Sequence, residues 1–219
     1  MLASILFIDL IAIYFSLRLL YRDREWRESI LASAVIWGTL VALSTEVMGF
    51  FHAIARPFLV LFWVLVLAVS LGLILRNRQE IQRKLNKPKV DGALAWGMLG
   101  VIVIYLGLTF LVAIIAPPNT NDSMQYHMSR VMHWMVNRSV DFFPTPSDRQ
   151  LWMPPFAEYA ILHFQVLAGS DRFANLVQWM SMFGSVIAAS LVASRLGAGQ
   201  KGQLFAALFA VTLPMGVLQ

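Results

Sequence analysis

The chain has 219 residues, of which 58% are hydrophobic and 13% are charged, and its mean hydropathy is +0.67. A soluble domain is nearer half apolar and a quarter charged, so this composition excludes an ordinary soluble protein and predicts a membrane protein. The sequence has no Cys, which excludes disulfides and thiolate metal sites. The net charge of +5 comes from basic residues in loops between apolar runs, a pattern typical of membrane topology and not of nucleic-acid binding.

Six apolar runs predict an all-α integral membrane protein, a polytopic bundle of about six transmembrane helices. Five of the runs are long enough to span, and the sixth is shorter; they cover residues 2–20, 30–51, 57–75, 93–116, 173–194 and 203–217. The first run is not typical of a cleavable signal peptide, because its basic residues follow the apolar stretch instead of preceding it. We expect it to stay in the protein, with its N-terminus outside.

Basic residues in the short loops predict which end of each helix is cytoplasmic. The first loop and the third loop are the basic ones; they hold Arg18, Arg22, Arg24 and Arg27, and Arg76, Arg78, Arg83, Lys84, Lys87 and Lys89. If both loops are cytoplasmic, the helix over 93–116 runs outward and delivers Asp122 to the extracytoplasmic face. The sequence thus predicts a multi-pass membrane protein.

The segment 154–169 is short for a span and carries Glu158, His163 and Gln165. Two interpretations follow. It crosses the membrane, or it lies at the interface as a juxtamembrane helix, which returns Arg195 and Lys201 to the cytoplasmic side. The positive-inside rule favours the second.

The loop over 117–172 holds the candidate site. Pro117-Pro118 ends the preceding helix, and Asp122 with Gln125 has the spacing of a capping box that starts a new one. The new helix has an apolar stripe expected to lie on the membrane, formed by Met124, Met128, Val131, Met132 and Met135. Its polar face is expected to hold Ser123, His127, Arg130, Trp134 and Asn137, with Tyr126 and His133 at the edges.

For the acidic residues the sequence allows a structural interpretation beside a functional one, and for the histidines it gives no metal motif. Asp122 is either the helix N-cap or an acid of a site at the membrane surface. His127 and His133 do not have the spacing of a known metal motif. Asp9 and Glu46 lie inside apolar runs, so we expect them to face the bundle, where they support a cavity or form an interhelical hydrogen bond.

From about residue 93 onward the chain resembles the GT-C membrane glycosyltransferases, closest to the protein O-mannosyltransferase, aminoarabinose-transferase and Rgt-like group. The residues that carry the resemblance are Asp122, the helix from Tyr126 to Trp134, Pro154-Pro155 with Tyr159, Gly169, Arg172, the small-residue helix Gly184 to Ala193, Arg195-Leu196-Gly197 and Leu213-Pro214. On this basis residues 1–92 form an N-terminal three-helix region with basic cytoplasmic loops. Residues 93–219 form an incomplete GT-C-like core with one helix, the outer loop 117–172, and two further helices over 173–217.

The resemblance implies a glycosyltransferase of a plasma (inner) membrane that moves a sugar, on the extracytoplasmic side, from a polyprenyl-phosphate donor to a glycan, lipid or protein acceptor. It implies that Asp122 is catalytic and that His127, Arg130 and Arg149 bind the leaving phosphate. Tyr126 and Glu158 join the substrate-binding group, Glu158 as a substitute second acid. No cofactor is required by the resemblance, although a divalent metal is compatible with it; the expected partners are substrates and membrane lipids, not nucleic acid.

The sequence also departs from the family. Ser123 stands where relatives often have a second acid, Trp152 and Met153 precede the Pro pair where a charged residue is usual, and three helices come before residue 93 instead of one. Family members have more helices, so the sequence predicts the N-terminal part of a longer enzyme. The alternatives are a transporter, with Asp9 and Glu46 on its path, and a non-catalytic membrane subunit.

Overall fold

The computed structural model describes residues 2–21, 24–77 and 90–213, and within them it contains helices and no strand. The long helices are α1 (Ser4–Leu20), α2 (Trp26–Phe50), α3 (Arg56–Arg76), α4 (Ala93–Ile115), α8 (Asn175–Arg195) and α9 (Gln200–Val211). Residues 116–174, between α4 and α8, are named the outer segment. This segment forms η2 (Ser123–His127), α5 (Met128–Asn137), α6 (Arg149–Trp152) and α7 (Phe156–Ala168). The predicted all-helical class is confirmed for this part of the chain.

Four helices, α2, α3, α4 and α8, are long and apolar enough to cross a membrane. They indicate a membrane-embedded protein. The first and last expected spans form α1 and α9, with 17 and 12 residues. Both are shorter than the roughly 20 residues that a span needs, so the count of six spans stays a prediction. Residues 214–217 of the last expected span, Pro214 included, lie outside the described residues.

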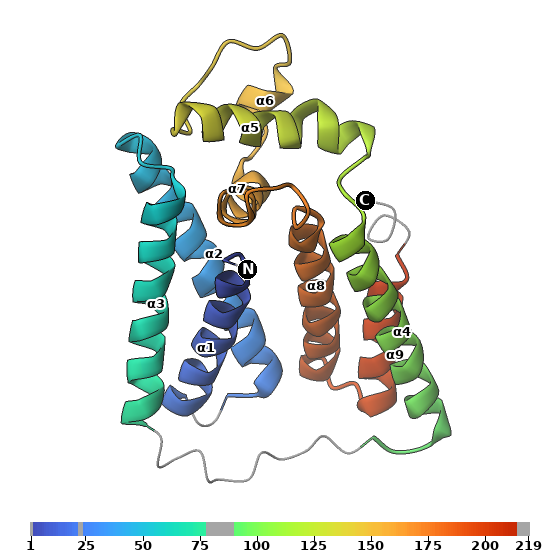
Figure 1. Cartoon of the computed structure of the whole chain (residues 1–219). Coiled ribbons are helices and arrows are strands. Elements are labelled where there is room, and N and C mark those ends of the chain that lie inside the picture. The colour runs from blue at the N-terminus through green and yellow to red at the C-terminus, as the bar shows by residue number, and fades with distance from the viewer. Residues whose placement is uncertain (1, 22–23, 78–89, 214–219) are drawn as a thin grey trace.

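The long helices form two groups (Figure 1). Helices α1, α2 and α3 pack together on one side, and α4, α8 and α9 pack together on the other, with α2 also touching α8. Helices α5 and α6 lie across one end of the bundle, and α7 is seen end-on between the groups, close to that same end. The predicted division of the chain at residue 92 stays a prediction. Helix α7 comes after this residue in the sequence, yet it packs against α2 and α3, which come before it.

Of the eleven Lys and Arg residues that the structure describes, five lie toward α5 and α6, namely Arg56, Arg130, Arg138, Arg149 and Arg172, and six lie at the opposite end of the bundle (Figure 1). These six follow α1 and α3, begin α2, and join α8 to α9; they are Arg18, Arg24, Arg27, Arg76, Arg195 and Lys201. Arg22, Arg78, Arg83, Lys84, Lys87 and Lys89 lie outside the described residues. Arg27 is buried and donates to Ser190 and Gln203, at 2.8 and 3.0 Å, so it also ties α2 to α8 and α9.

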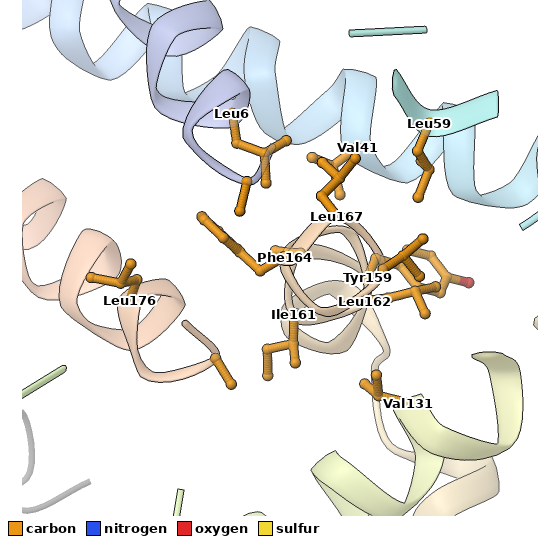
Figure 2. Close-up of a cluster of buried hydrophobic side chains, with 14 of the residues drawn as sticks. Leu6, Val41, Leu59, Val131, Tyr159, Ile161, Leu162, Phe164, Leu167 and Leu176 are labelled. Atoms are coloured by element: carbon orange, nitrogen blue, oxygen red, sulfur yellow. The ribbon is translucent and has the colours of Figure 1, made fainter. Parts of the chain in front are cut away.

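Helix α7 is the most enclosed element. All ten residues from Glu158 to Leu167 are buried. Figure 2 shows α7 end-on, with Leu6, Val41 and Leu59 on one side and Val131 and Leu176 on others. Its axis does not follow that of the long helices (Figure 1), so α7 does not run beside them as a further span, and its depth in the membrane stays a prediction.

A chain of buried hydrogen bonds fastens α7 to α2 and α3 through His163. Trp63 Nε1 donates to His163 Nδ1 at 3.0 Å, which leaves Nε2 as the protonated nitrogen. His163 Nε2 therefore donates to Thr45 Oγ1 at 2.9 Å, and Thr45 donates to the carbonyl of Val41 at 2.8 Å. Burial lowers the pKa of His163 from 6.5 to about 3, so the ring stays neutral at ordinary pH.

The lowered pKa of His163 predicts that the free energy of unfolding decreases as the pH falls. Below pH 6.5 the unfolded chain binds a proton at His163, whereas the folded chain binds it only near pH 3. Between these values the free energy of unfolding should fall by up to about 1.4 kcal/mol for each unit of falling pH. Thermal unfolding in detergent between pH 4 and 8 measures this slope.

Replacement of the ring tests the assignment. His163→Gln should lower the unfolding temperature at pH 8 and remove this part of the slope. His52→Asn is the matched control, because His52 is exposed and its φ of 50° is one that Asn tolerates. Identical slopes for the wild type and His163→Gln would contradict the assignment.

Candidate active site

The start of the outer segment is capped by Thr120 and not by Asp122. Ser123 N donates to Thr120 Oγ1 at 3.1 Å, and the Asp122 side chain makes no capping hydrogen bond. The predicted capping box of Asp122 and Gln125 is therefore wrong. An earlier hydroxyl satisfies the free backbone donor, and the carboxylate of Asp122 is left with 59% of its side chain exposed.

Asp122 faces His127, one wide helical turn further on. The five residues from Ser123 to His127 form a π-helix, a rare element that is often found at functional sites. His127 Nε2 lies 3.7 Å from Asp122 Oδ2. The neighbouring ring of Tyr126 lies with its centroid 3.8 Å from that of His127.

Tyr126 is held in its neutral form. Burial raises the pKa of Tyr126 above its usual value of 10.0, and the nearby carboxylates of Asp122 and Glu158 act in the same direction. The guanidinium groups of Arg130 and Arg149 oppose the shift. Its hydroxyl can therefore donate a hydrogen bond into the site.

Glu158 lies on the other side of the imidazole of His127. Its carboxylate is buried, with 1% of the side chain exposed, and its Oε1 lies 3.1 Å from His127 Nδ1. These atoms attract each other when the ring is protonated, but they lack the alignment of a hydrogen bond. The same Oε1 accepts a hydrogen bond of 3.0 Å from Arg130 Nη1. An exposed acid, an imidazole and a buried acid thus form one row.

Arg130 is fully buried and fixes the outer loop from inside. Besides Glu158, it donates to the main-chain carbonyls of Gln150 and Arg149 at 2.7 Å each, and to that of Met153 at 3.0 Å. The guanidinium thus joins α5, α6 and α7. Its donors point at protein groups, so its proposed contact with a substrate phosphate has no support in this arrangement.

Burial of Arg130 also corrects the predicted faces of α5. Arg130 and Trp134 were expected on the polar face, but both are buried with Met128 and Val131. The buried face of α5 packs on α7, and Arg130 is enclosed because Glu158 and three carbonyls receive its donors. Met124 and Met132 of the expected lipid stripe remain exposed.

The Arg130–Glu158 ion pair predicts that replacement of either residue destabilises the protein, and that the two losses are not additive. Removal of one partner leaves the other charge buried and unpaired, which costs about 3–5 kcal/mol. Arg130→Met and Glu158→Gln should each lower the unfolding temperature markedly in detergent. The double variant should lose clearly less than the sum of the two, because neither charge is then left alone.

Arg138→Met serves as the control, since Arg138 is exposed on the same layer of the protein. It should leave the unfolding temperature within a degree or two of the wild type. Additive losses in the double variant would show that the two side chains do not depend on each other.

Arg149 lies beside Asp122. Its Nη1 lies 3.9 Å from Asp122 Oδ1, and both side chains are more than half exposed. Such a pair contributes little to stability, because water screens it. Its carbonyl is held by Arg130, so the backbone of Arg149 is fixed while its side chain stays free to meet a ligand.

Two neighbouring cavities lie at this site. A polar pocket of about 400 Å³ has walls from Asp122, Tyr126 and His127 on one side and from α7 and α8 on the other. An apolar cavity of about 610 Å³ lies between α1, α2 and α8. The two share Ala157, Val177 and Gln178 as lining residues, so the cavities are neighbours.

The structure adds residues to the site that the sequence did not single out. Asn175 and Gln178 border the polar pocket from the first turn of α8, and Thr120 borders it beside Asp122. Two polar side chains three residues apart at the start of an apolar helix were the available signal. Within the described residues no group of three His, Asp or Glu is arranged to hold a metal.

Asp9 and Glu46 lie apart from these residues. Glu46 accepts a hydrogen bond from the hydroxyl of Tyr159, which links α2 to α7, as the interhelical alternative predicted. Asp9 is buried in α1, and both its oxygens lack a hydrogen-bond partner among the described residues. Neither acid borders the polar pocket.

Comparisons of the chain with protein-family models, with curated proteins and with solved structures found no match.

Proposed function

We propose that the protein is a GT-C-type membrane glycosyltransferase that moves a sugar from a polyprenyl-phosphate donor to an extracytoplasmic acceptor. The observation that carries the proposal is the adjacency of the two cavities. An apolar cavity at the level of the long helices adjoins a polar pocket that holds a carboxylate and an imidazole. A substrate with an apolar tail and a polar head matches an apolar cavity that lies next to a polar pocket.

The donor would lie with part of its prenyl chain in the apolar cavity and its sugar phosphate in the polar pocket. Aromatic and aliphatic side chains from α1, α2 and α8 line the first, among them Phe7, Trp37 and Phe183. Hydrogen-bonding groups of Thr120, Tyr126 and Asn175 line the second. Burial of each methylene of a prenyl chain would contribute about 0.8 kcal/mol, so the tail would supply much of the affinity.

The chemistry would be an exchange at the anomeric carbon. The acceptor hydroxyl oxygen forms a bond to this carbon as the bond from the carbon to the phosphate oxygen breaks, and Asp122 takes the hydroxyl proton. The polyprenyl phosphate leaves with the electron pair. Arg149 and His127 would offset its charge, because both stand beside Asp122 and keep exposed atoms.

The proposed sidedness rests on the distribution of charge. The basic residues of the loops that join α1 to α2, follow α3 and join α8 to α9 lie at the end of the bundle opposite the polar pocket (Figure 1), whereas Arg56, Arg138, Arg149 and Arg172 lie toward the pocket. The positive-inside rule assigns that end to the cytoplasm and the pocket to the outer face of a plasma membrane.

Asp122→Asn tests the function. It keeps the size of the side chain, and no cap is lost, because Thr120 caps the helix. Transfer from radiolabelled polyprenyl-phosphate sugars in membranes that contain the protein should fall by about 100-fold or more. Asp148→Asn is the control, since Asp148 is exposed in the same outer segment and should retain transfer. Equal transfer by the wild type and Asp122→Asn would reject the role of this acid.

A transporter is the second candidate, and Asp9 is the observation that favours it. An unpaired acid inside a bundle is costly and often marks an ion path. Under this alternative Asp9→Asn should abolish ion-coupled uptake into proteoliposomes, while Asp122→Asn should not. The third alternative, a non-catalytic subunit, took Asp122 as a helix cap, and the capping by Thr120 removes that argument.

A further inference from the structure

A third cavity lies beside the polar pocket, between α5 and the end of α7. Its volume is about 730 Å³, and Met128 borders both it and the polar pocket. One wall is formed by thioether side chains of η2 and α5, and the other by residues at the end of α7; together they include Met124, Met128, Met132, Met135, Gln165 and Asp171. The glycosyl transfer proposed above makes no use of this cavity.

Gln165 places a buried polar side chain in the wall of the cavity. The residue is only 4% exposed, it borders the cavity, and its Oε1 is buried with no hydrogen-bond partner among the described residues. Buried polar side chains in native proteins are nearly always paired, so an unpaired amide at a cavity wall indicates a ligand that supplies the partner.

The surroundings of Gln165 select the chemistry of that ligand. Methionine side chains are apolar and adapt their shape, so they suit a hydrocarbon body. An anionic head is disfavoured, because the carbonyl end of α7 lies there and no Lys or Arg is among the described lining residues. A cationic head is disfavoured as well: Asp171 is exposed and its charge is screened by water, and the neutral amide of Gln165 cannot compensate for the lost hydration of the cation. A hydroxyl both donates and accepts, so it satisfies the amide whichever polar atom faces it.

We propose that the cavity between α5 and α7 binds an uncharged amphiphile through a hydroxyl group hydrogen-bonded to Gln165. This site is distinct from the Asp122 pocket and concerns binding alone, so it does not depend on glycosyl transfer.

Photolabelling of the purified full chain in detergent tests the site. Three probes with the same long alkyl chain and the same diazirine would differ only in the head: an alcohol, its methyl ether and a carboxylate. Mass spectrometry measures the label on peptides that cover 124–136 and 165–171. We expect the alcohol to label them about fivefold more than the ether, the factor that one hydrogen bond of ordinary net strength confers. The carboxylate should label them least.

Variants separate this site from its neighbour. Gln165→Leu should bring the alcohol down to the level of the ether, whereas Gln178→Leu, the same change at the other two cavities, should keep the preference. Asp122→Asn should also keep it, so a failure of the proposed transfer would not affect this result. Met132→Trp, which fills the cavity from a half-exposed position, should reduce labelling by all three probes.

Equal labelling by the alcohol and the ether in the wild type would overturn the proposal. So would a carboxylate that labels as well as the alcohol. If Gln165→Leu does not fold, the ratio of alcohol to ether in the wild type and the loss in Met132→Trp still decide the outcome.

Discussion

The buried ion pair of Arg130 and Glu158 determines how the outer layer is built. Two charges removed from water are costly, and they are stable here because the guanidinium also donates to three main-chain carbonyls. Helices α5 and α6 are short; the buried face of α5 also packs on α7, and Gln150 Nε2 of α6 donates to the carbonyl of Gln125 at 2.8 Å. One side chain therefore connects α5, the loop with α6, and α7, and the exposed residues of the site depend on that connection.

Helix α7 carries this constraint into the bundle. It is surrounded by α2, α3, α5 and α8, and the bonds of His163 fix its rotation against α2 and α3. Because Ala157 and Ile161 of α7 line the polar pocket, the wall opposite Asp122 has the rigidity of the core. The acid itself lies just before the π-helix, with 59% of its side chain exposed, so few packing contacts oppose its adjustment to a substrate. A fixed wall and an adjustable acid suit a site that must receive a lipid-borne substrate.

The long helices were predictable from hydropathy because a span needs only length and apolar composition. The ends of these helices were harder to predict. Helix α2 begins at Trp26, four residues before the expected start, because Glu25 and Glu28 form a capping box there. In the outer segment, Asp122 was predicted as the cap, but Thr120 caps the helix; Asp and Thr are both common N-caps, so the sequence alone does not distinguish them. The faces of α5 were misassigned because periodicity shows that a helix is amphipathic, but not that an arginine will be buried. The partner of Arg130 is 28 residues away, at Glu158, and no local pattern reports such a pairing.

The mode in which Arg130 holds the outer loop has an evolutionary consequence. It contacts the carbonyl groups of Arg149, Gln150 and Met153, which every amino acid possesses, and not their side chains. The side chain at position 149 can therefore change in charge or size without disturbing the clamp beneath it. Such a scaffold separates the part that keeps the fold from the part that meets the ligand, so selection can alter ligand preference one residue at a time.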